Sequence, residues 1–186
     1  MTTSDPTRTR RFEQVALPHL DSAYTLARWL TGSDADAQDV VQDAYLRAFK
    51  YFDGFAGGDA RAWMLAIVRN TCWSWLGRNR PRDAVPLDDE EAQAAELEAA
   101  IAAQDDPESA MIARGDEALL KHLLAELPAP FREVMVLREI EELSYQEIAT
   151  IAAIPIGTVM SRLARARRKL QRAWRQREKK ESAGGL

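Results

Sequence analysis

The sequence predicts an all-α fold of two small helical domains joined by a flexible acidic linker, the C-terminal domain containing a helix-turn-helix. Apolar residues recur at helical spacing in both halves of the chain, and no segment alternates in the manner of a strand. The charges are segregated: residues 83–108 hold ten acidic side chains and no Lys or Arg, whereas residues 161–180 hold ten basic and one acidic side chain. We therefore expect an N-terminal domain over 10–80, a linker over 81–111 and a C-terminal domain over 112–178.

The composition limits the classes of function. The 186 residues carry 25 basic and 29 acidic side chains, and a hydrophobic content of 46% is typical of a folded protein. The single cysteine, Cys72, excludes an internal disulfide and a cysteine-built zinc site. No apolar run approaches the ~20 residues of a membrane span and no signal core is present, so we expect a cytoplasmic protein. Because no phosphate loop, catalytic triad or metal motif occurs, we expect neither an enzyme nor a cofactor or metal site.

The N-terminal domain should contain three amphipathic helices. One spans residues 20–30, and a second begins after Ser33, which is spaced with Asp36 as a capping box. A third begins after Asp59 and continues to Leu76. On the second helix Asp36, Asp39 and Asp43 form an acidic row beside the apolar stripe. This row is either a solvated face with favourable placement near the helix start or a docking surface for a basic partner.

The third helix combines tryptophan with arginine. Exposed tryptophans beside arginines would stack on unpaired bases while the guanidinium groups bind the phosphates. Tryptophans buried in the core would have no such role, and both alternatives stay open. The residues concerned are Trp63, Trp73, Trp75, Arg61, Arg69, Arg78, Arg80 and Arg82.

The C-terminal domain should contain helices over 118–127 and 131–141, followed by a helix-turn-helix. Ser144 and Glu147 form a capping box for its first helix, and Pro155 separates that helix from the second. Small residues at Gly157 and Thr158 should keep the junction slim. The second helix has a core stripe of Val159, Leu163, Ala166 and Leu170, and an opposite side of Ser161, Arg162, Arg165, Arg168 and Lys169. Such a basic side fits the major groove of DNA, or it is a solvated helical face.

Taken in order, three segments resemble the extracytoplasmic-function group of bacterial sigma factors. "DAQDVVQDAYLRAFKYFDGF" resembles the helix that binds core RNA polymerase, and "AWMLAIVRNTCWSWLGR" resembles the segment that melts and reads the minus-ten element. "LPAPFREVMVLREIEELSYQEIATIAAIPIGTVMSRLARARRKL" resembles the domain that reads the minus-thirty-five element. The match spans nearly the whole chain in the family's order, apart from the linker.

The resemblance implies a transcription initiation factor that binds core RNA polymerase, directs it to promoter DNA and is controlled by a cognate anti-sigma factor. The polymerase contacts would be the β subunit and the coiled coil of the β′ subunit, the latter facing Asp36, Asp39, Gln42 and Asp43. The implied minus-ten contacts are Phe55, Asp59, Arg69, Asn70, Trp73 and Arg78, in which the loop 54–59 and Asn70 hold a flipped-out base. The implied minus-thirty-five contacts are Arg138, Tyr145, Thr158, Ser161, Arg162, Arg165 and Arg168.

Several alternatives stay open at this point. Ala56, Met160 and Ala164 stand where the family often has larger or basic residues, so the promoter sequence is not defined. The acidic linker is either a plain spacer or a segment that imitates nucleic acid in basic channels of the polymerase. The rival functions are a stand-alone helix-turn-helix regulator and a sigma-like decoy that never touches DNA.

Overall fold

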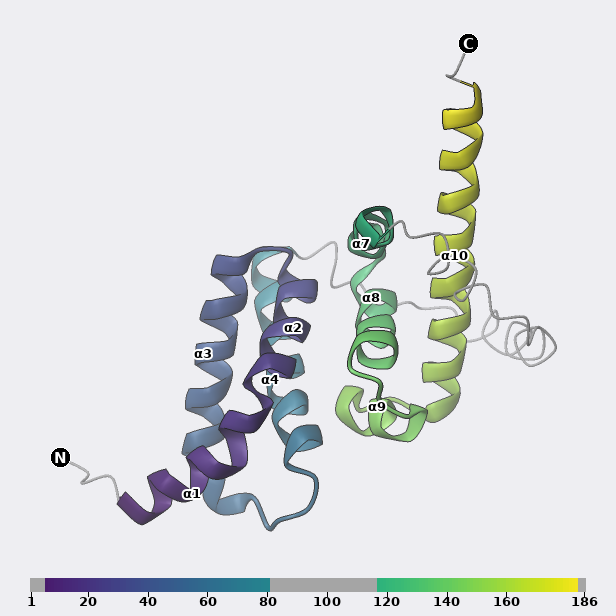
Figure 1. Cartoon of the computed structure of the whole chain (residues 1–186). Helices are drawn as coiled ribbons and strands as arrows, with labels where there is room; N and C mark the ends of the chain where they lie inside the picture. Colours follow the sequence, from purple (N-terminus) through teal and green to yellow (C-terminus); the bar gives the residue numbers. More distant parts are fainter. Residues whose placement is uncertain (1–5, 81–116, 184–186) are drawn as a thin grey trace.

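The computed structural model describes residues 6–80 and 117–183, and within these two ranges every regular element is a helix. The N-terminal unit consists of α1 (Pro6–Ala16), the short 3-10 turn η1 (Leu17–His19), α2 (Leu20–Thr31), α3 (Asp34–Lys50), η2 (Phe52–Gly54) and α4 (Ala60–Asn79). The C-terminal unit consists of α7 (Glu117–Glu126), α8 (Ala129–Met135), the π-helical turn η3 (Val136–Ile140), α9 (Tyr145–Ala152) and α10 (Ile156–Ala183). Figure 1 shows the two units side by side, with the end of α10 extending beyond the rest. The expected linker over 81–111 lies outside the described residues.

Helices α2, α3 and α4 pack against one another around a core rich in alanine. Ala23 and Ala27 of α2 and Ala44 of α3 are fully buried, and these small side chains allow the helix backbones to approach closely. The remaining volume is filled by Leu26, Leu30, Val40, Val41, Leu65, Val68, Cys72 and Leu76. Leu20, the first residue of the predicted amphipathic helix, is 41% exposed and lies outside this core.

The helices in this unit begin and end at capping residues that can be recognised in the sequence. The Ser33 side chain accepts a hydrogen bond from Asp36 N at 3.4 Å, and that of Asp59 accepts one from Ala62 N at 3.0 Å. Gly32 ends α2 with a left-handed φ of 77°, a conformation that other residues adopt only with strain. The predicted starts of α3 and α4 are therefore confirmed.

Helix α1 was not predicted. Phe12 of this helix is 8% exposed. Its ring makes edge-to-face contacts with the rings of Phe49 and Phe52, at centroid distances of 5.1 and 5.3 Å. Edge-to-face contacts of this kind add to the burial of each ring. The result is a second hydrophobic cluster at the end of α3, next to the loop that leads into α4.

The predicted helix over 131–141 ends in a π-helical turn rather than as a plain α-helix. Glu141 N donates to Val136 O at 3.0 Å, a spacing of five residues, and Leu143 N donates to Leu137 O at 3.0 Å. Glu142 then adopts a left-handed φ of 55°. A π-helical turn contains one residue more than an α-helical turn, and this extra residue changes the direction of the chain as it enters α9.

The helix-turn-helix is present. Ser144 Oγ accepts from Glu147 N at 3.3 Å while Ser144 N donates to the Glu147 carboxylate at 2.7 Å, which forms the predicted capping box. Ala153 ends α9 with a φ of 53°, and α10 follows at an angle of 104°. This angle falls in the range of about 90–120° found in helix-turn-helix motifs.

Replacing Ser144 with alanine should lower the free energy of unfolding by about 1 kcal/mol, because it removes the N-cap of α9. Hydrogen bonds from Ser144 hold the pKa of Glu147 below its ordinary value of 4.5. The carboxylate part of the box is therefore complete at neutral pH and is lost as the pH falls through that lowered pKa. Urea unfolding at pH 7 would measure the decrease in the free energy of unfolding. Ser74→Ala, an exposed serine inside α4, is the control and should have little effect or stabilise slightly.

Gly157 does not have the role that the sequence predicted for it. A Cβ atom at this position would meet no atom within 4 Å, so the close crossing of α9 and α10 does not require a glycine there. The turn is instead held by Pro155, whose carbonyl accepts from Thr158 N at 3.0 Å and from Val159 N at 3.2 Å.

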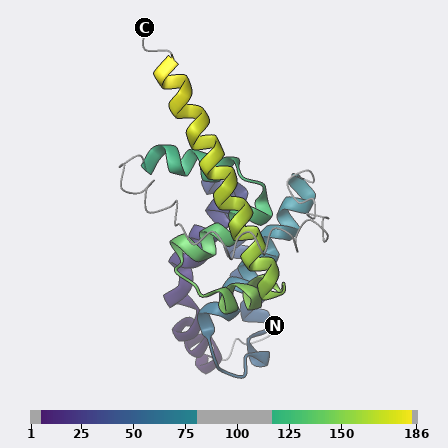
Figure 2. The same cartoon turned by 90° about the vertical axis from the view of Figure 1, so that its right-hand side faces the viewer.

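The two units lie directly against each other. Helix α4 packs on α9 and α2 packs on α8, and one hydrophobic cluster includes side chains from both units. Figure 2 shows α10 crossing in front of the N-terminal helices when the C-terminal unit faces the viewer. The contact between the two units therefore covers one side of α4, the helix that contains most of the predicted minus-ten residues.

Candidate nucleic-acid interface and acidic face

The acidic row of α3 lies on the surface. Asp39, Gln42 and Asp43 are exposed and Asp36 is half-buried, since their spacing places them beside the buried stripe of the same helix. Asp43 pairs with Arg47 at 3.3 Å, in an exposed pair on its own helix. These four residues are named the acidic face below. Asp34 at the start of α3 is already engaged: hydrogen bonds from Tyr24 and Arg28 lower the pKa of its carboxyl group.

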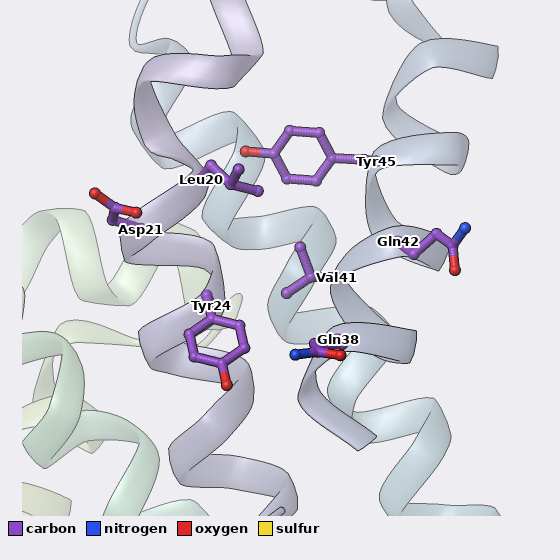
Figure 3. A pocket seen from close by; sticks show the side chains of 7 residues that line it. All are labelled: Leu20, Asp21, Tyr24, Gln38, Val41, Gln42 and Tyr45. Carbon is purple, nitrogen blue, oxygen red and sulfur yellow. The ribbon is translucent and has the colours of Figure 1, made fainter. Parts of the chain in front are cut away.

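A groove of about 470 Å³ lies between α2 and α3, next to the acidic face. Figure 3 shows Tyr45 of α3 extending toward Leu20 of α2, with Val41 between the two helices and Gln42 at the outer edge. The Tyr45 hydroxyl donates to Ala16 O at 2.9 Å, and burial raises the pKa of Tyr45 to about 12. This groove was not predicted, because its lining comes from two helices and no local sequence pattern shows that they are in contact. The lining residues are Leu20, Asp21, Tyr24, Gln38, Val41, Gln42 and Tyr45.

The loop before α4 is held by aromatic stacking and by α1. Phe55 lies 4.8 Å from the Trp63 ring and 6.2 Å from Phe52, measured between centroids. Arg8 of α1 donates to Asp53 Oδ1 at 2.8 Å and to Phe49 O at 2.7 Å. The hydrogen bond from Arg8 lowers the pKa of Asp53. Arg8 thus supports the loop, a role that the sequence analysis did not predict.

Helix α4 brings several predicted minus-ten residues together. Arg69 lies over the Trp73 ring at 5.2 Å and donates to Asn70 Oδ1 at 3.3 Å. Arg69 and Trp73 both also donate to Glu133 of α8, at 2.6 and 2.7 Å. Asn70 and Arg78 are exposed. Trp63, Trp73 and Trp75 are each partly buried. Each therefore contacts the protein interior and also leaves part of its ring accessible to solvent.

Cys72 faces inward from the same helix and should be unreactive. It is 0% exposed, and burial, followed by the nearby charge of Glu133, raises the pKa of its thiol from 9.0 to about 12. Because the thiolate is the reactive form, this rise lowers its population roughly a thousandfold. We expect iodoacetamide at pH 8 to label Cys72 at least about 100-fold more slowly in the folded protein than in urea. Equal labelling rates in the two conditions, measured by intact mass, would contradict this burial.

The predicted minus-thirty-five residues lie on three elements. Arg138 of η3 stacks over the Tyr145 ring at 5.2 Å and donates to Leu143 O at 2.8 Å, so these two predicted contacts adjoin. Thr158 lies half-buried in the first turn of α10, and Arg168 is exposed further along the same helix. Arg165 is half-buried between them. The basic side continues through the exposed residues Lys169, Arg172, Arg175, Arg177 and Lys179.

Ser161 requires a correction. Ser161 was predicted on the outward side of the second helix, but it is 3% exposed and its hydroxyl donates to Thr158 O at 3.1 Å. Helix α10 packs against both α8 and α9, so its buried sector is wider than a single stripe and includes Ser161. Arg162 is also turned inward, with its side chain 19% exposed at 3.9 Å from Glu133.

The chain matches known proteins over both units. Residues 16–82 match sigma-70 region 2, and residues 117–170 match sigma-70 region 4. An RNA polymerase sigma-H factor of Pseudomonas aeruginosa is 33% identical over 168 residues, which cover 88% of this chain and 86% of that protein. An ECF RNA polymerase sigma-E factor of Escherichia coli is 37% identical over 136 residues, 71% of this chain and 70% of that one.

Two solved structures are similar along most of the chain. The sigma factor RpoE in complex with the anti-sigma factor NepR from Bartonella quintana has a TM-score of 0.64 at 28% identity, covering 89% of this chain and 98% of that one. CnrH in complex with the cytosolic domain of CnrY has a TM-score of 0.59 at 27% identity, covering 90% of each chain.

The fold and these matches define a sigma factor of the sigma-70 family, the class of proteins that direct RNA polymerase to promoters. Regions 2 and 4 correspond to the two helical units. Within that family the chain belongs to the extracytoplasmic-function group.

Among residues 6–80 and 117–183, no single helix is long and apolar enough to cross a membrane. Only α9 and α10 taken together reach that length and composition, and they are bent by 104°.

Proposed function

We propose that this sigma factor docks on core RNA polymerase through the acidic face of α3 and through contacts of the C-terminal unit with the β subunit. Asp39, Gln42 and Asp43 of the acidic face are exposed, and the pair of Asp43 with Arg47 is a surface pair, which is worth little to stability. A row of carboxylates suits a basic coiled coil such as that of the β′ subunit, because opposite charges steer association and fix register. The site of action would then be the cytoplasm.

Helix α4 and the loop before it would open and read the minus-ten element. Gly57 and Gly58 have φ values of 96° and 98°, so the loop backbone takes a shape that favours glycine. Phe55, Trp63 and Trp73 provide aromatic surfaces, and Arg69 and Arg78 provide charge for phosphates. A preformed loop of this kind would offset the few kcal/mol needed to extrude a base. Asp59 both caps α4 and, with Asn70, would contact that base.

The helix-turn-helix would read the minus-thirty-five duplex. The angle of 104° between α9 and α10 allows the start of α10 to enter the major groove while α9 crosses the backbone. Arg138, Tyr145, Thr158 and Arg165 would lie nearest the DNA, with Arg168 on a phosphate. Arg162, which lies 3.9 Å from Glu133 in this structure, would contact a phosphate only after leaving that carboxylate. We retain Ser161 in this set only as a residue that positions α10, because its side chain is buried in the structure.

An anti-sigma factor would control the protein. Two structural relatives of this chain, RpoE of Bartonella quintana and CnrH, were solved in complex with NepR and with the cytosolic domain of CnrY. In this chain the groove between α2 and α3 offers an apolar surface beside the acidic face, and a helix bound there would block the approach of polymerase.

The observation that carries the proposal is the presence, on one chain, of an exposed acidic face and a separate helix-turn-helix. The test is to mix the purified protein with core RNA polymerase and look for co-elution on gel filtration. The holoenzyme would then be used to select promoter fragments from a random DNA pool. Failure to co-elute with active core from several bacteria would contradict the proposal. Tight binding of a symmetric duplex without polymerase would instead support a stand-alone regulator.

A further inference from the structure

One arginine of helix α1 binds the end of α3 and the start of the loop that follows it. Arg8 donates from Nε to Asp53 Oδ1 at 2.8 Å and from Nη2 to Phe49 O at 2.7 Å. Its guanidinium carbon lies 4.5 Å from the centroid of the Phe49 ring. Phe49 O belongs to the last turn of α3, where carbonyl groups lack partners within the helix. Arg8 therefore joins the first turn of α1 to positions 41 and 45 residues later in the chain.

Two further side chains of α1 pack on the residue next to Asp53. Phe12, one helical turn after Arg8, lies 5.3 Å from Phe52 between ring centroids. The guanidinium carbon of Arg11 lies 5.5 Å from the centroid of the same ring. Phe52 is 3% exposed as a result of this packing and that of its other neighbours. Helix α1 thus contacts two consecutive residues of η2.

A tight turn connects these two residues to Phe55, one of the predicted minus-ten contacts. Gly54 N donates to Tyr51 O at 3.0 Å, and Phe55 N donates to Phe52 O at 2.9 Å. The Phe55 and Phe52 rings are stacked, with 15° between their planes and 6.2 Å between their centroids. The position of Phe55 therefore depends on residues that α1 holds in place.

The other end of the loop is fixed by α4. Asp59 caps that helix by accepting from Ala62 N at 3.0 Å. Between the two ends lie Gly57 and Gly58, and a Cβ atom added to either would meet no atom within 4 Å, chain neighbours aside. Because the middle of the loop has open space around it, its shape is set mainly at its ends. Helix α1 provides the support at one end and Asp59 provides it at the other.

We propose that α1 is a positioning element of the minus-ten site, in which Arg8 holds Asp53 and the end of α3 so that the loop keeps the shape that accepts an extruded base. The match to sigma-70 region 2 begins at residue 16, the last residue of α1, and so assigns no role to this helix. The inference rests on the strand-opening role proposed for the loop. Loss of Arg8 should slow strand opening without weakening the binding of polymerase or of the minus-thirty-five duplex, since those contacts are proposed for other parts of the chain.

The test uses Arg8→Gln and Asp53→Asn, singly and together, each in the full chain assembled with core RNA polymerase. The Asp53 side chain is 78% exposed, and an exposed ion pair contributes little to stability, so the variants should fold. The template is a promoter fragment selected by the unchanged holoenzyme. We expect each variant to open it about tenfold more slowly, measured by permanganate oxidation of unpaired thymines. Affinities for core polymerase and for the minus-thirty-five duplex should be unchanged.

A matched control and the double variant separate the proposed contact from a general effect of charge. Arg10→Gln removes an equal charge from an exposed position of the same helix and should open the promoter at the unchanged rate. The double variant should be no slower than Arg8→Gln alone, because both changes break the same pair. Two independent effects would instead multiply. If Arg8→Gln does not fold, Asp53→Asn tests the same pair from its exposed side.

The outcomes are distinct. Folded variants that open the promoter at the unchanged rate would overturn the proposal. Equal losses in strand opening, core affinity and the unfolding midpoint would also overturn it, since Arg8 would then serve only the stability of the N-terminal unit. A failure of the proposed function would already appear with the unchanged protein, as absence of co-elution with core polymerase or of strand opening on any selected fragment. The inference would fall with it.

Discussion

Changing Asp39 and Asp43 together to lysine should weaken binding to core RNA polymerase by about 100-fold or more. The change replaces two carboxylates on the acidic face with two ammonium groups, so attraction to a basic partner becomes repulsion. Like charges placed together at an interface cost several kcal/mol, and each 1.4 kcal/mol corresponds to tenfold in affinity. Competition against a labelled sigma factor for a fixed amount of core polymerase would measure the loss.

The fold should survive this double change. Both side chains are exposed, and the pair of Asp43 with Arg47 at 3.3 Å is a surface pair, which is worth little to stability. Circular dichroism and the unfolding midpoint should therefore match those of the unchanged protein. The matched control is Glu13→Lys with Glu126→Lys, which alters the net charge equally at exposed positions on other helices than α3. An equal loss of affinity in the control would show that net charge, and not the acidic face, governs binding.

The local signals in the sequence predicted most helix boundaries correctly. Ser33, Asp59 and Ser144 are small polar residues whose side chains accept from backbone N–H groups three residues ahead, and each starts a helix as expected. Such signals are local, because the bonds join residues close together in the chain. Helix α1 lacked a comparable signal: it buries only Phe12 and Ala16, too few apolar residues to define a period.

Features that depend on contacts between elements could not be predicted. The spacing of α10 identified Leu163 and Ala166 as core residues, but it could not show that a second neighbouring helix buries Ser161 as well. Likewise, nothing near Glu133 in the sequence points to Arg69, which lies 64 residues earlier. The predicted functional residues of α4 were placed on one helix correctly. Their engagement by the C-terminal unit follows only from tertiary packing.

Replacing Leu163 with alanine should lower the free energy of unfolding of the C-terminal unit by about 2–5 kcal/mol. Leu163 is 1% exposed in the hydrophobic cluster, where α10 packs against α8 and α9. Truncation removes buried methyl groups and leaves a cavity that the surrounding helices fill only partly. Because this packing fixes α10 relative to α9, binding of the minus-thirty-five duplex by the holoenzyme should fall in parallel. Urea unfolding followed by circular dichroism would give the change in stability.

Leu46→Ala provides the matched control, since it deletes the same atoms from a side chain that is 63% exposed on α3. Surface substitutions of this kind usually change stability by no more than about 0.5 kcal/mol, and alanine slightly favours the helix. A large gap between the two variants would assign the effect of Leu163 to core packing. If Leu163→Ala cost as little as Leu46→Ala, then α10 would not be packed on α8 and α9 in solution, and the arrangement that orients the helix-turn-helix toward DNA would be wrong.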